Sequence, residues 1–277
     1  VFAPGQFFPD LITERSLDFL EQNRRGPFFL YLAYNTPHYP EQAPKEFAEP
    51  FKDMKDPARK SYATIMKATD HYIGKIMERL ETLKLRENTI IIYMSDNGHS
   101  EETGNRIRVD NHKSGHPKGH FYGASGGGST GKWIGQKGSF LEGGIRVPAI
   151  ISYPAKVPKG EVRDQAITAM DWFPTVTELC GIQPKSTDPK LDGNSVMKII
   201  QSADAPSPNK VMHWQWHTGW AVRKGDWKLI GRGTKASFLG NLTDAQPERK
   251  NYHRERSEVV GELMKLHLEW AKEVKPK

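Results

Sequence analysis

Residues 89–100 read TIIIYMSDNGHS, a run of mostly aliphatic residues that ends abruptly in an acid, an amide and a glycine. A short apolar run of this composition is typical of a buried β-strand. The preceding residues 57–85 carry apolar side chains at intervals of three and four, which predicts one long amphipathic helix. A helix that leads into a buried strand is typical of an α/β sheet with helices on its faces, and this is the fold class we expect.

The same order of helix and strand occurs elsewhere in the chain. An amphipathic pattern over 10–23 leads into the apolar run FFLYLAY at 28–34, and PAIISYP at 148–154 predicts a third buried strand. Two further helices are expected over 171–179 and 194–201. Together these elements favour one large α/β domain, which we assign to residues 1–205.

The character of the sequence changes after the proline-rich segment 202–210. The runs VMHWQWH, GWAVRK and DWKLIG are short, strand-like and separated by turn residues, which predicts an antiparallel meander. An amphipathic pattern over 257–274 predicts a closing helix. We therefore expect a second, smaller subdomain of antiparallel sheet and helix over residues 206–277.

Composition limits the kinds of protein that this chain can be. Its 277 residues contain no run of roughly 18 apolar residues, so we expect no membrane span. The net charge of +7 favours anionic partners, but the sequence has no RNA-binding aromatic motif, zinc-finger spacing or basic helix, which argues against nucleic acid. The single cysteine, Cys180, is expected to be a small buried residue rather than a nucleophile.

Polar residues that follow the predicted strands are the first candidates for a site, because ligands gather at the carboxyl ends of strands in α/β sheets. Asp96 and Asn97 fit a plain turn, or a hard-cation site with carboxylate and amide oxygens as ligands. His38 lies in NTPHYP, between two prolines that would hold it rigidly. Lys137 lies among glycines in GQKGSF, where one ammonium group can be aimed at an anion.

The long segment between His99 and Gly138 has no periodicity and is rich in glycine, histidine and lysine. A loop of this length beside a strand end is more typical of a substrate-binding loop than of a linker. Polar residues of this loop could instead be solvated without contacting a substrate, and the histidines of the meander could instead belong to a packed sheet core. Weaker candidates for substrate contact come from both places: His99, His112, His116, Lys118, His120, His213 and His217.

The order of these motifs narrows the choice. PFFLYLAYNTPHYP, a long helix, IIIYMSDNG, KGSFLEGGIRVPAII and TAMDWFPTVTELCGI follow one another in a way that closely resembles the sulfatase family, from about Asp10 to Tyr252. The resemblance implies an alkaline-phosphatase-like α/β fold. It also implies a hydrolase that removes sulfate from a sulfated molecule, and the basic charge and histidine-rich loop favour a carbohydrate.

The resemblance implies roles for individual residues as well. In sulfatases the Asp-Asn of the DNG stretch binds a divalent cation, usually calcium and alternatively magnesium, and those positions are Asp96 and Asn97 here. The histidine of the THYP-like stretch contacts the sulfate or the ester oxygen, and that position is His38. The lysine that precedes the GxxxEGG stretch binds sulfate oxygens, and that position is Lys137.

One departure from the family pattern concerns the nucleophile. Sulfatases use a formylglycine made from Cys or Ser in a C/S-x-P-x-R motif, and this sequence contains no such motif, since Cys180 is followed by Gly181 and Ile182. We expect the formylglycine, and the acidic pair that completes the metal site, to lie upstream of Val1. The chain alone should then be inactive, and should need that part or an oligomeric partner to cover its sheet.

Two alternatives remain open at this point. A phosphatase or phosphodiesterase of the same superfamily would share the fold. A non-catalytic remnant that binds sulfated glycans would keep Lys137 and the basic loop but would need no nucleophile. Family resemblance favours a periplasmic or secreted location, although the sequence has no signal-like segment.

Overall fold

The computed structural model describes residues 7–38, 41–100, 126–183, 185 and 188–274, and the backbone of residues 120–122. The chain divides into two compact units. The first unit combines Val1–Thr89 with His99–Ser129, and the second combines Ile90–Gly98 with Thr130–Lys277. No helix in the described ranges has both the length and the apolar character that a membrane crossing needs.

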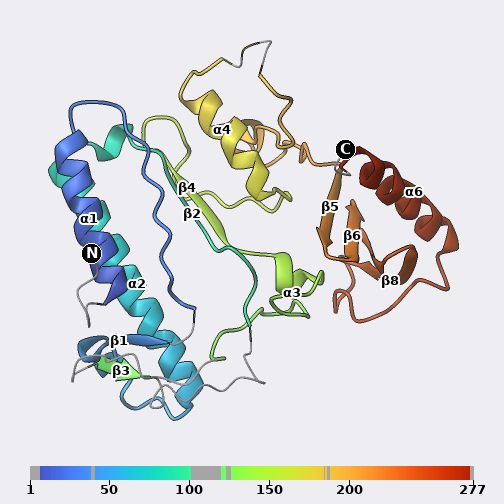
Figure 1. Ribbon diagram of the computed structural model, residues 1–277, viewed down its shortest axis with the longest axis horizontal. Helices are drawn as coiled ribbons and strands as arrows, with labels where there is room; N and C mark the ends of the chain where they lie inside the picture. Colours follow the sequence, from blue (N-terminus) through green and yellow to red (C-terminus); the bar gives the residue numbers. More distant parts are fainter. Residues whose placement is uncertain are drawn as a thin grey trace. The chain divides into compact units, whose positions relative to one another are not determined.

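Two helices lie side by side in the first unit (Figure 1). α1 spans Phe8–Asn23 and α2 spans Pro57–Thr82, which confirms both predicted helices to within a few residues. α2 begins where it does because proline suits the first helical turn. In addition, the carboxylate of Asp56 accepts hydrogen bonds from two backbone N–H groups of that turn.

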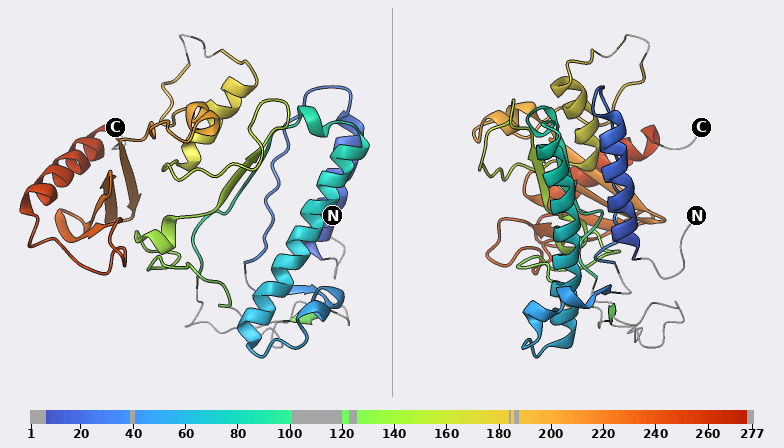
Figure 2. Two further views of the ribbon diagram at one scale, coloured as in Figure 1. Left: turned by 180° about the vertical axis from the view of Figure 1, so that it is seen from behind. Right: turned by 90° about the vertical axis from the view of Figure 1, so that its left-hand side faces the viewer.

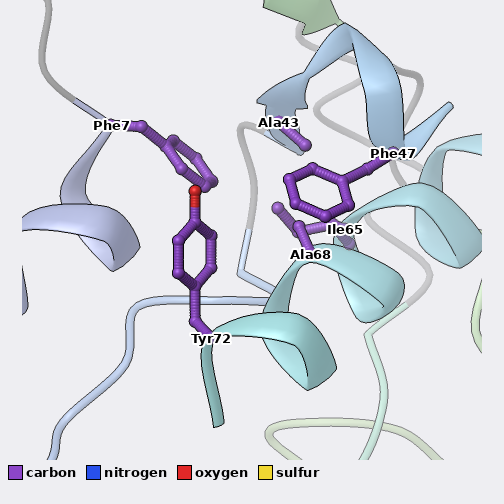
Figure 3. Packing of buried hydrophobic residues seen from close by; sticks show 6 residues of the cluster. All are labelled: Phe7, Ala43, Phe47, Ile65, Ala68 and Tyr72. Carbon is purple, nitrogen blue, oxygen red and sulfur yellow. The ribbon is translucent and has the colours of Figure 1, made fainter. Parts of the chain in front are cut away.

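The inner face of α2 closes a small apolar core. Ile65, Ala68 and Tyr72 are almost fully buried and belong to one cluster with Phe7 and Phe47 (Figure 3). The Tyr72 ring lies 5.9 Å from the ring of Phe7 and 6.1 Å from that of Phe47, which are favourable aromatic distances. These helix residues recur at intervals of three and four, which is the pattern that predicted the helix.

A short antiparallel pair joins distant parts of the first unit (Figure 2). β1 (Gln42–Pro44) pairs with β3 (His120–Tyr122), with Ala43 opposite Phe121. Two 3₁₀ turns follow β1, at Lys45–Phe47 and Glu49–Phe51. β1 contacts α2, so this pair closes the end of the apolar core.

The predicted strand at 28–34 is wrong. Its side chains alternate between partly buried and exposed, as in a strand, but no neighbouring strand pairs with it among the described residues. A strand needs ladder hydrogen bonds from a neighbour, and none is supplied here. Phe29 and Tyr31 are consequently 82% and 80% exposed. That another segment or subunit covers this face stays a prediction.

The second unit contains the strand of the DNG stretch. β2 (Ile91–Met94) pairs antiparallel with β4 (Ala149–Ser152), and Ile92 lies opposite Ile151, so both predicted strands are confirmed. The partly buried Ile151 of β4 packs against a cluster of buried residues that two helices help to build. These helices are α4 (Trp172–Leu179), close to its predicted range, and α5 (Met197–Gln201), which is shorter than predicted.

A buried aspartate connects these helices. The carboxylate of Asp171 is fully buried and accepts hydrogen bonds from the backbone of Thr168 at 2.6 Å and of Asn194 at 2.8 Å. The side chain of Asn209 donates a third, at 2.6 Å. These donors offset the cost of burying the charge.

The prediction that Cys180 is buried is wrong. Cys180 is the residue that follows α4, and it is exposed. The preceding Leu179 occupies the buried position at the end of that helix. The helical pattern therefore ends one residue before the cysteine, which is why its burial was misjudged.

The C-terminal part of the second unit is an antiparallel sheet crossed by a helix (Figures 1 and 2). The strands follow one another in the order β5 (Val211–Trp216), β6 (Gly219–Lys224), β7 (Trp227–Arg232) and β8 (Lys235–Asn241). α6 (Ser257–Glu273) contacts the last three. The predicted meander and closing helix are confirmed, while a domain boundary between residues 205 and 206 stays a prediction.

Two histidines pack between this sheet and α6. His213 stacks on Trp270 with ring centroids 4.8 Å apart, and His267 stacks on Trp220 at 3.9 Å. Burial and, to a lesser extent, the neighbouring His267 together lower the pKa of His213 to about 4. Burial also lowers the pKa of His267. Both rings are therefore packed in their neutral form.

We predict that the C-terminal sheet loses stability as the pH falls from about 6.5 toward about 4. In this range the unfolded state takes up protons on these two histidines and the folded state does not, so lower pH favours unfolding. His213→Phe should remove roughly 1–2 kcal/mol of this dependence, given that the ring is partly exposed. Urea titrations followed by tryptophan fluorescence at neutral and acidic pH measure the effect.

The control for this experiment is His217→Asn, at the exposed turn between β5 and β6. His217 has a φ of 52°, a conformation that asparagine tolerates well. This variant should keep the pH dependence of the wild type. An unchanged pH dependence in His213→Phe would contradict the prediction.

Candidate functional site

The DNG turn follows β2 directly. The Asp96 carboxylate is exposed, and its Oδ1 accepts a hydrogen bond from the backbone N–H of Asn97 at 2.9 Å. Asn97 Nδ2 donates to the carbonyl of Gly98 at 3.0 Å, which orients the amide. Ser95 Oγ donates to the Asn97 carbonyl at 3.2 Å. These local bonds fix the turn and leave a carboxylate and an amide oxygen on adjacent residues.

Glycine is required at the end of this turn because another backbone passes very close. The Gly98 N–H donates to the carbonyl of Gly144 at 2.9 Å. A Cβ on Gly98 would lie 1.9 Å from the carbonyl oxygen of Gly143, a distance that no side chain allows. The EGG motif, which forms the short helix α3 (Glu142–Ile145), therefore packs directly on the DNG turn.

The same motif packs on the loop that carries Lys137. A Cβ on Gly144 would lie 2.4 Å from the carbonyl oxygens of Gln136 and Ser139, the residues on either side of the loop tip. The Ser139 N–H donates to the Gln136 carbonyl at 3.0 Å, so the tip is a closed turn. Lys137 is exposed at this tip. The structure thus brings the DNG turn and the Lys137 loop together through two glycines.

The donor types of the DNG turn fit a hard divalent cation, since calcium and magnesium prefer carboxylate and amide oxygens. Their number does not complete a site. Within the described ranges, no three His, Cys, Asp or Glu side chains come close enough together to hold a metal ion. As cation ligands, Asp96 and Asn97 would therefore need further oxygens to complete a site.

A buried group of charges holds the EGG motif against the C-terminal sheet. Lys228 on β7 is fully buried, and its Nζ lies 2.8 Å from Glu142 Oε1 and 2.5 Å from Glu248 Oε1. Glu248 Oε2 accepts a hydrogen bond from the backbone N–H of Glu142 at 2.7 Å. We name Glu142, Lys228 and Glu248 the buried charge cluster. It joins the loop of the candidate site to residues more than 80 positions later in the chain.

Two arginines complete the surroundings of Glu142. Arg146 Nε donates to Glu142 Oε2 at 2.7 Å, and the Arg146 guanidinium lies 4.0 Å from the centre of the Trp133 ring. Arg223 is 3.9 Å from the same carboxylate. Burial raises the pKa of Glu142, but the charges of Lys228, Arg146 and Arg223 and the hydrogen bond from Lys228 outweigh it and lower the pKa overall. Glu142 is thus held as a carboxylate.

Sequence analysis did not identify this cluster. Lys228 lies in DWKLIG, where a lysine between aromatic and aliphatic residues is the available signal of a buried cation. Lysine is almost never fully buried unless it is paired. Its two partners, one 86 residues upstream and one 20 residues downstream, could be predicted only from the three-dimensional fold.

His38 belongs to the first unit, in the turn that follows the extended segment. It is exposed, and its backbone N–H donates to the Asn35 carbonyl at 3.0 Å. The Thr36–Pro37 peptide bond is cis. Thr69 on α2 donates a hydrogen bond to Thr36 Oγ1 at 2.7 Å, which anchors this turn to the long helix.

Glu41, three residues after His38, is a titratable residue that sequence analysis did not single out. It is 5% exposed and accepts a hydrogen bond from Ser61 Oγ. Burial raises the pKa of Glu41 to about 7, against the lowering effect of that hydrogen bond. A buried carboxyl group that titrates near neutrality is a candidate acid or base.

The weaker candidates fall in different places. His99 contacts Tyr62 edge to face at 6.1 Å and packs against Gly128 in the first unit. His213 packs under α6, in agreement with the packed-sheet alternative, whereas His217 is exposed. His120 lies in β3 opposite Pro44. Three candidates lie outside the described residues: His112, His116 and Lys118.

Comparison with known proteins bears directly on this site. The sequence profile of the sulfatase family matches residues 4–182, which include the DNG turn and the Lys137 loop. The chain belongs to the sulfatase family. A second profile, for the C-terminal part of N-sulphoglucosamine sulphohydrolase, matches residues 132–268 and so includes all three residues of the buried charge cluster.

Among curated relatives, the chain is 30% identical over 223 residues to the N-acetylgalactosamine-6-sulfatase of Mus musculus, which covers 79% of this chain and 37% of the mouse protein. It is 28% identical over 275 residues to the N-acetylgalactosamine-6-O-sulfatase of Bacteroides thetaiotaomicron, which covers 93% of this chain and 50% of that protein. The chain therefore spans half or less of the length of these two relatives.

Among solved structures, Ps i-CgsB in complex with k-i-k-neocarrahexaose matches with a TM-score of 0.77 and 26% identity, over 96% of this chain and 55% of that one. A Bacteroides thetaiotaomicron sulfatase described with glycosaminoglycan metabolism matches with a TM-score of 0.72 and 28% identity, over 95% and 54%. The predicted alkaline-phosphatase-like α/β fold is confirmed. Sulfatases in general use a metal ion and a formylglycine.

We predict that Lys228→Met destabilises the second unit by about 3–5 kcal/mol, because it removes the buried cation that pairs with Glu248 and leaves Glu142 with only Arg146 and Arg223. Urea titration followed by tryptophan fluorescence measures the loss. The matched control is Lys224→Met, which breaks the exposed pair of Lys224 with Glu262 and should cost less than about 1 kcal/mol. Equal midpoints for the two variants would show that the buried cluster is not a structural support.

We also predict that Gly98→Ala destabilises the protein by at least about 2 kcal/mol, because the added methyl group collides with the backbone of the EGG motif. Gly74→Ala is the control. Gly74 lies within α2 with open space around it, so alanine there should stabilise the helix by about 0.5–1 kcal/mol. Thermal unfolding of both variants measures the difference. Wild-type stability in Gly98→Ala would mean that the two motifs are not in close contact.

Proposed function

We propose that this chain forms part of a sulfuric ester hydrolase that removes sulfate from a sulfated carbohydrate. One observation carries the proposal. This chain belongs to the sulfatase family, and its EGG motif packs both on the DNG turn and on the Lys137 loop. Oxygen ligands for a cation and a cationic side chain are thereby presented by neighbouring turns, and this pairing suits a substrate whose charge sits on several oxygens.

We assign the roles as follows. Asp96 and Asn97 supply a carboxylate and an amide oxygen to a divalent cation, with calcium as the first choice and magnesium as the second. When bound, such an ion would stabilise negative charge on the sulfate oxygens. Lys137 adds a positive charge for the same oxygens. His38 is assigned to a hydrogen bond with the ester oxygen of the leaving group.

A sulfated carbohydrate is favoured as the substrate for two reasons. Two relatives carry the names N-acetylgalactosamine-6-sulfatase and N-acetylgalactosamine-6-O-sulfatase, and one structural neighbour was solved with k-i-k-neocarrahexaose. The net charge of +7 also favours a polyanionic substrate. Membership of the sulfatase family is the basis on which we also propose a secreted or periplasmic location.

The nucleophile is assigned to a formylglycine that these 277 residues do not supply. No Cys or Ser of the sequence is followed by the Pro and Arg of the C/S-x-P-x-R motif. Within this chain, the proposed residues therefore bind and orient the substrate and stabilise its charge. They do not by themselves cleave the ester.

We predict that the chain binds N-acetylgalactosamine 6-sulfate in the presence of calcium, and that Lys137→Ala and Asp96→Asn each weaken this binding by about tenfold or more, because each removes a charge assigned to the sulfate or its cation. Isothermal titration calorimetry with and without chelator measures the affinities. Lys132→Ala is the matched control, since Lys132 is an exposed lysine of the same unit that lies over the Trp133 ring.

Each alternative function has its own outcome in this experiment. Binding that survives chelation of the metal would favour a non-catalytic glycan-binding protein. Tighter binding of N-acetylgalactosamine 6-phosphate than of the sulfate would favour a phosphatase or phosphodiesterase. Equal loss of affinity in Lys132→Ala and Lys137→Ala would remove Lys137 from its assigned role.

A further inference from the structure

A small pocket opens next to the Lys137 loop. Its volume is about 240 Å³, and its lining begins at Gly138, the residue after Lys137. One wall comes from the loop and α3, with Phe140 and Ile145, and the other from β5, with Trp214 and Trp216. All of these residues belong to the second unit. The pocket thus joins the candidate sulfate-binding loop to the C-terminal sheet.

The position of the two walls is fixed by a close contact. Gly219, at the start of β6, lies so near the Phe140 ring that a Cβ there would be 2.9 Å from Phe140 Cε2. Gly219 is paired with Trp216 across the β5–β6 hairpin. Phe140 therefore seats the hairpin against the loop, and the buried charge cluster holds the two parts together from β7. The pocket is a consequence of rigid packing on both sides.

Trp216 is unusual for its exposure. Its side chain is 60% exposed, although a large aromatic ring is costly to leave in water. Among the strands that the structure describes, β5 is an edge strand that pairs with β6 alone, so none of them lies beyond it next to Trp216. The neighbouring His217 ring lies 5.1 Å away and tilted by 48°, which supports one side of the indole. An exposed and supported aromatic ring beside a candidate anion site is a platform for a ligand.

We propose that this pocket is the subsite for the pyranose ring that carries the sulfate held by Lys137. This inference rests on the proposed function and extends it to the residues that recognise the sugar ring. The C–H face of a pyranose is apolar and slightly positive, so it stacks well on the negative face of an indole. Gln215 also lines the pocket, and because its Nε2 donates to the His217 carbonyl at 3.4 Å, its amide oxygen is the group left to accept from a sugar hydroxyl.

The size of the pocket favours one sugar ring over larger ligands. Sites for drug-sized molecules commonly have volumes of roughly 300–1,000 Å³, so about 240 Å³ suits a smaller group. Further sugar residues of a longer glycan would extend into solvent past the exposed edge of Trp216. The structure therefore assigns recognition to the single ring next to the sulfate.

The test separates recognition of the sugar from recognition of the sulfate. Isothermal titration calorimetry on the whole 277-residue chain, with calcium present, uses three probes: N-acetylgalactosamine, N-acetylgalactosamine 6-sulfate and inorganic sulfate. Trp216→Ala should abolish measurable binding of the neutral sugar and weaken binding of the sulfated sugar about tenfold. Its binding of inorganic sulfate should be unchanged. Trp216→Phe should keep most of the sugar affinity because it keeps a ring.

The control variant is Phe173→Ala, which removes an aromatic ring of 63% exposure on α4, away from the pocket lining. It should bind all three probes as the wild type does. Equal sugar binding by the wild type and Trp216→Ala would overturn the subsite and leave the proposed function standing. If Lys137→Ala then loses sulfate binding while Trp216→Ala keeps sugar binding, the proposed function stands and only the sugar subsite is wrong.

Two further outcomes also count against the proposal. If 4-nitrophenyl sulfate loses as much affinity as the sulfated sugar in Trp216→Ala, the pocket takes any flat apolar ring and the assignment to a sugar is wrong. If the wild type binds the neutral sugar but neither the sulfated sugar nor inorganic sulfate, the proposed function fails, and the pocket is then not the subsite of a sulfate-bearing ring.

Discussion

The ion pairs of Lys228 with Glu142 and Glu248 are the constraint on which the second unit depends. A fully buried ammonium group is stable because two carboxylates neutralise it, and the backbone N–H of Glu142 satisfies the second carboxylate in turn. Since Glu142 opens the EGG motif, the same bonds set the position of the loop that carries Lys137. A charge in the C-terminal sheet therefore determines where the candidate sulfate-binding residue lies.

The glycines of the EGG and DNG motifs then set how closely the turns of the candidate site pack. They allow three backbone segments to approach more closely than any residue with a Cβ would permit. The side chains of Asp96, Asn97 and Lys137 are exposed or partly exposed, but the turns that carry them rest on backbone contacts. The geometry of this site is thus set by main-chain packing, and its chemistry by a few side chains at the tips.

How much of this could be predicted from the sequence depends on the range of the interaction. Local periodicity gave α1, α2, α4, α6, β2, β4 and the C-terminal meander, because hydrophobic faces follow the intervals of three, four or two. The same reasoning failed for residues 28–34, where the period-two pattern is real but a strand also needs a neighbour. The motif order identified the family, but the close packing of the EGG motif on the DNG turn was seen only in the structure. The partners of Lys228 and the pocket at Trp216 arise from contacts between residues far apart in sequence, which no local pattern records.

The buried charge cluster also limits how this protein can be recombined. Its cation lies on β7, whereas one of its anions lies in the loop of the candidate site and the other after β8. A chimera that took its C-terminal sheet from another protein would join unmatched charges unless the donor presented a cation facing Glu142. The junction would then contain a buried acid that has lost its lysine and keeps Arg146 as its counter-ion. The safe crossover points keep all three residues on one parental segment, so a replaced C-terminal sheet must be joined upstream of Glu142.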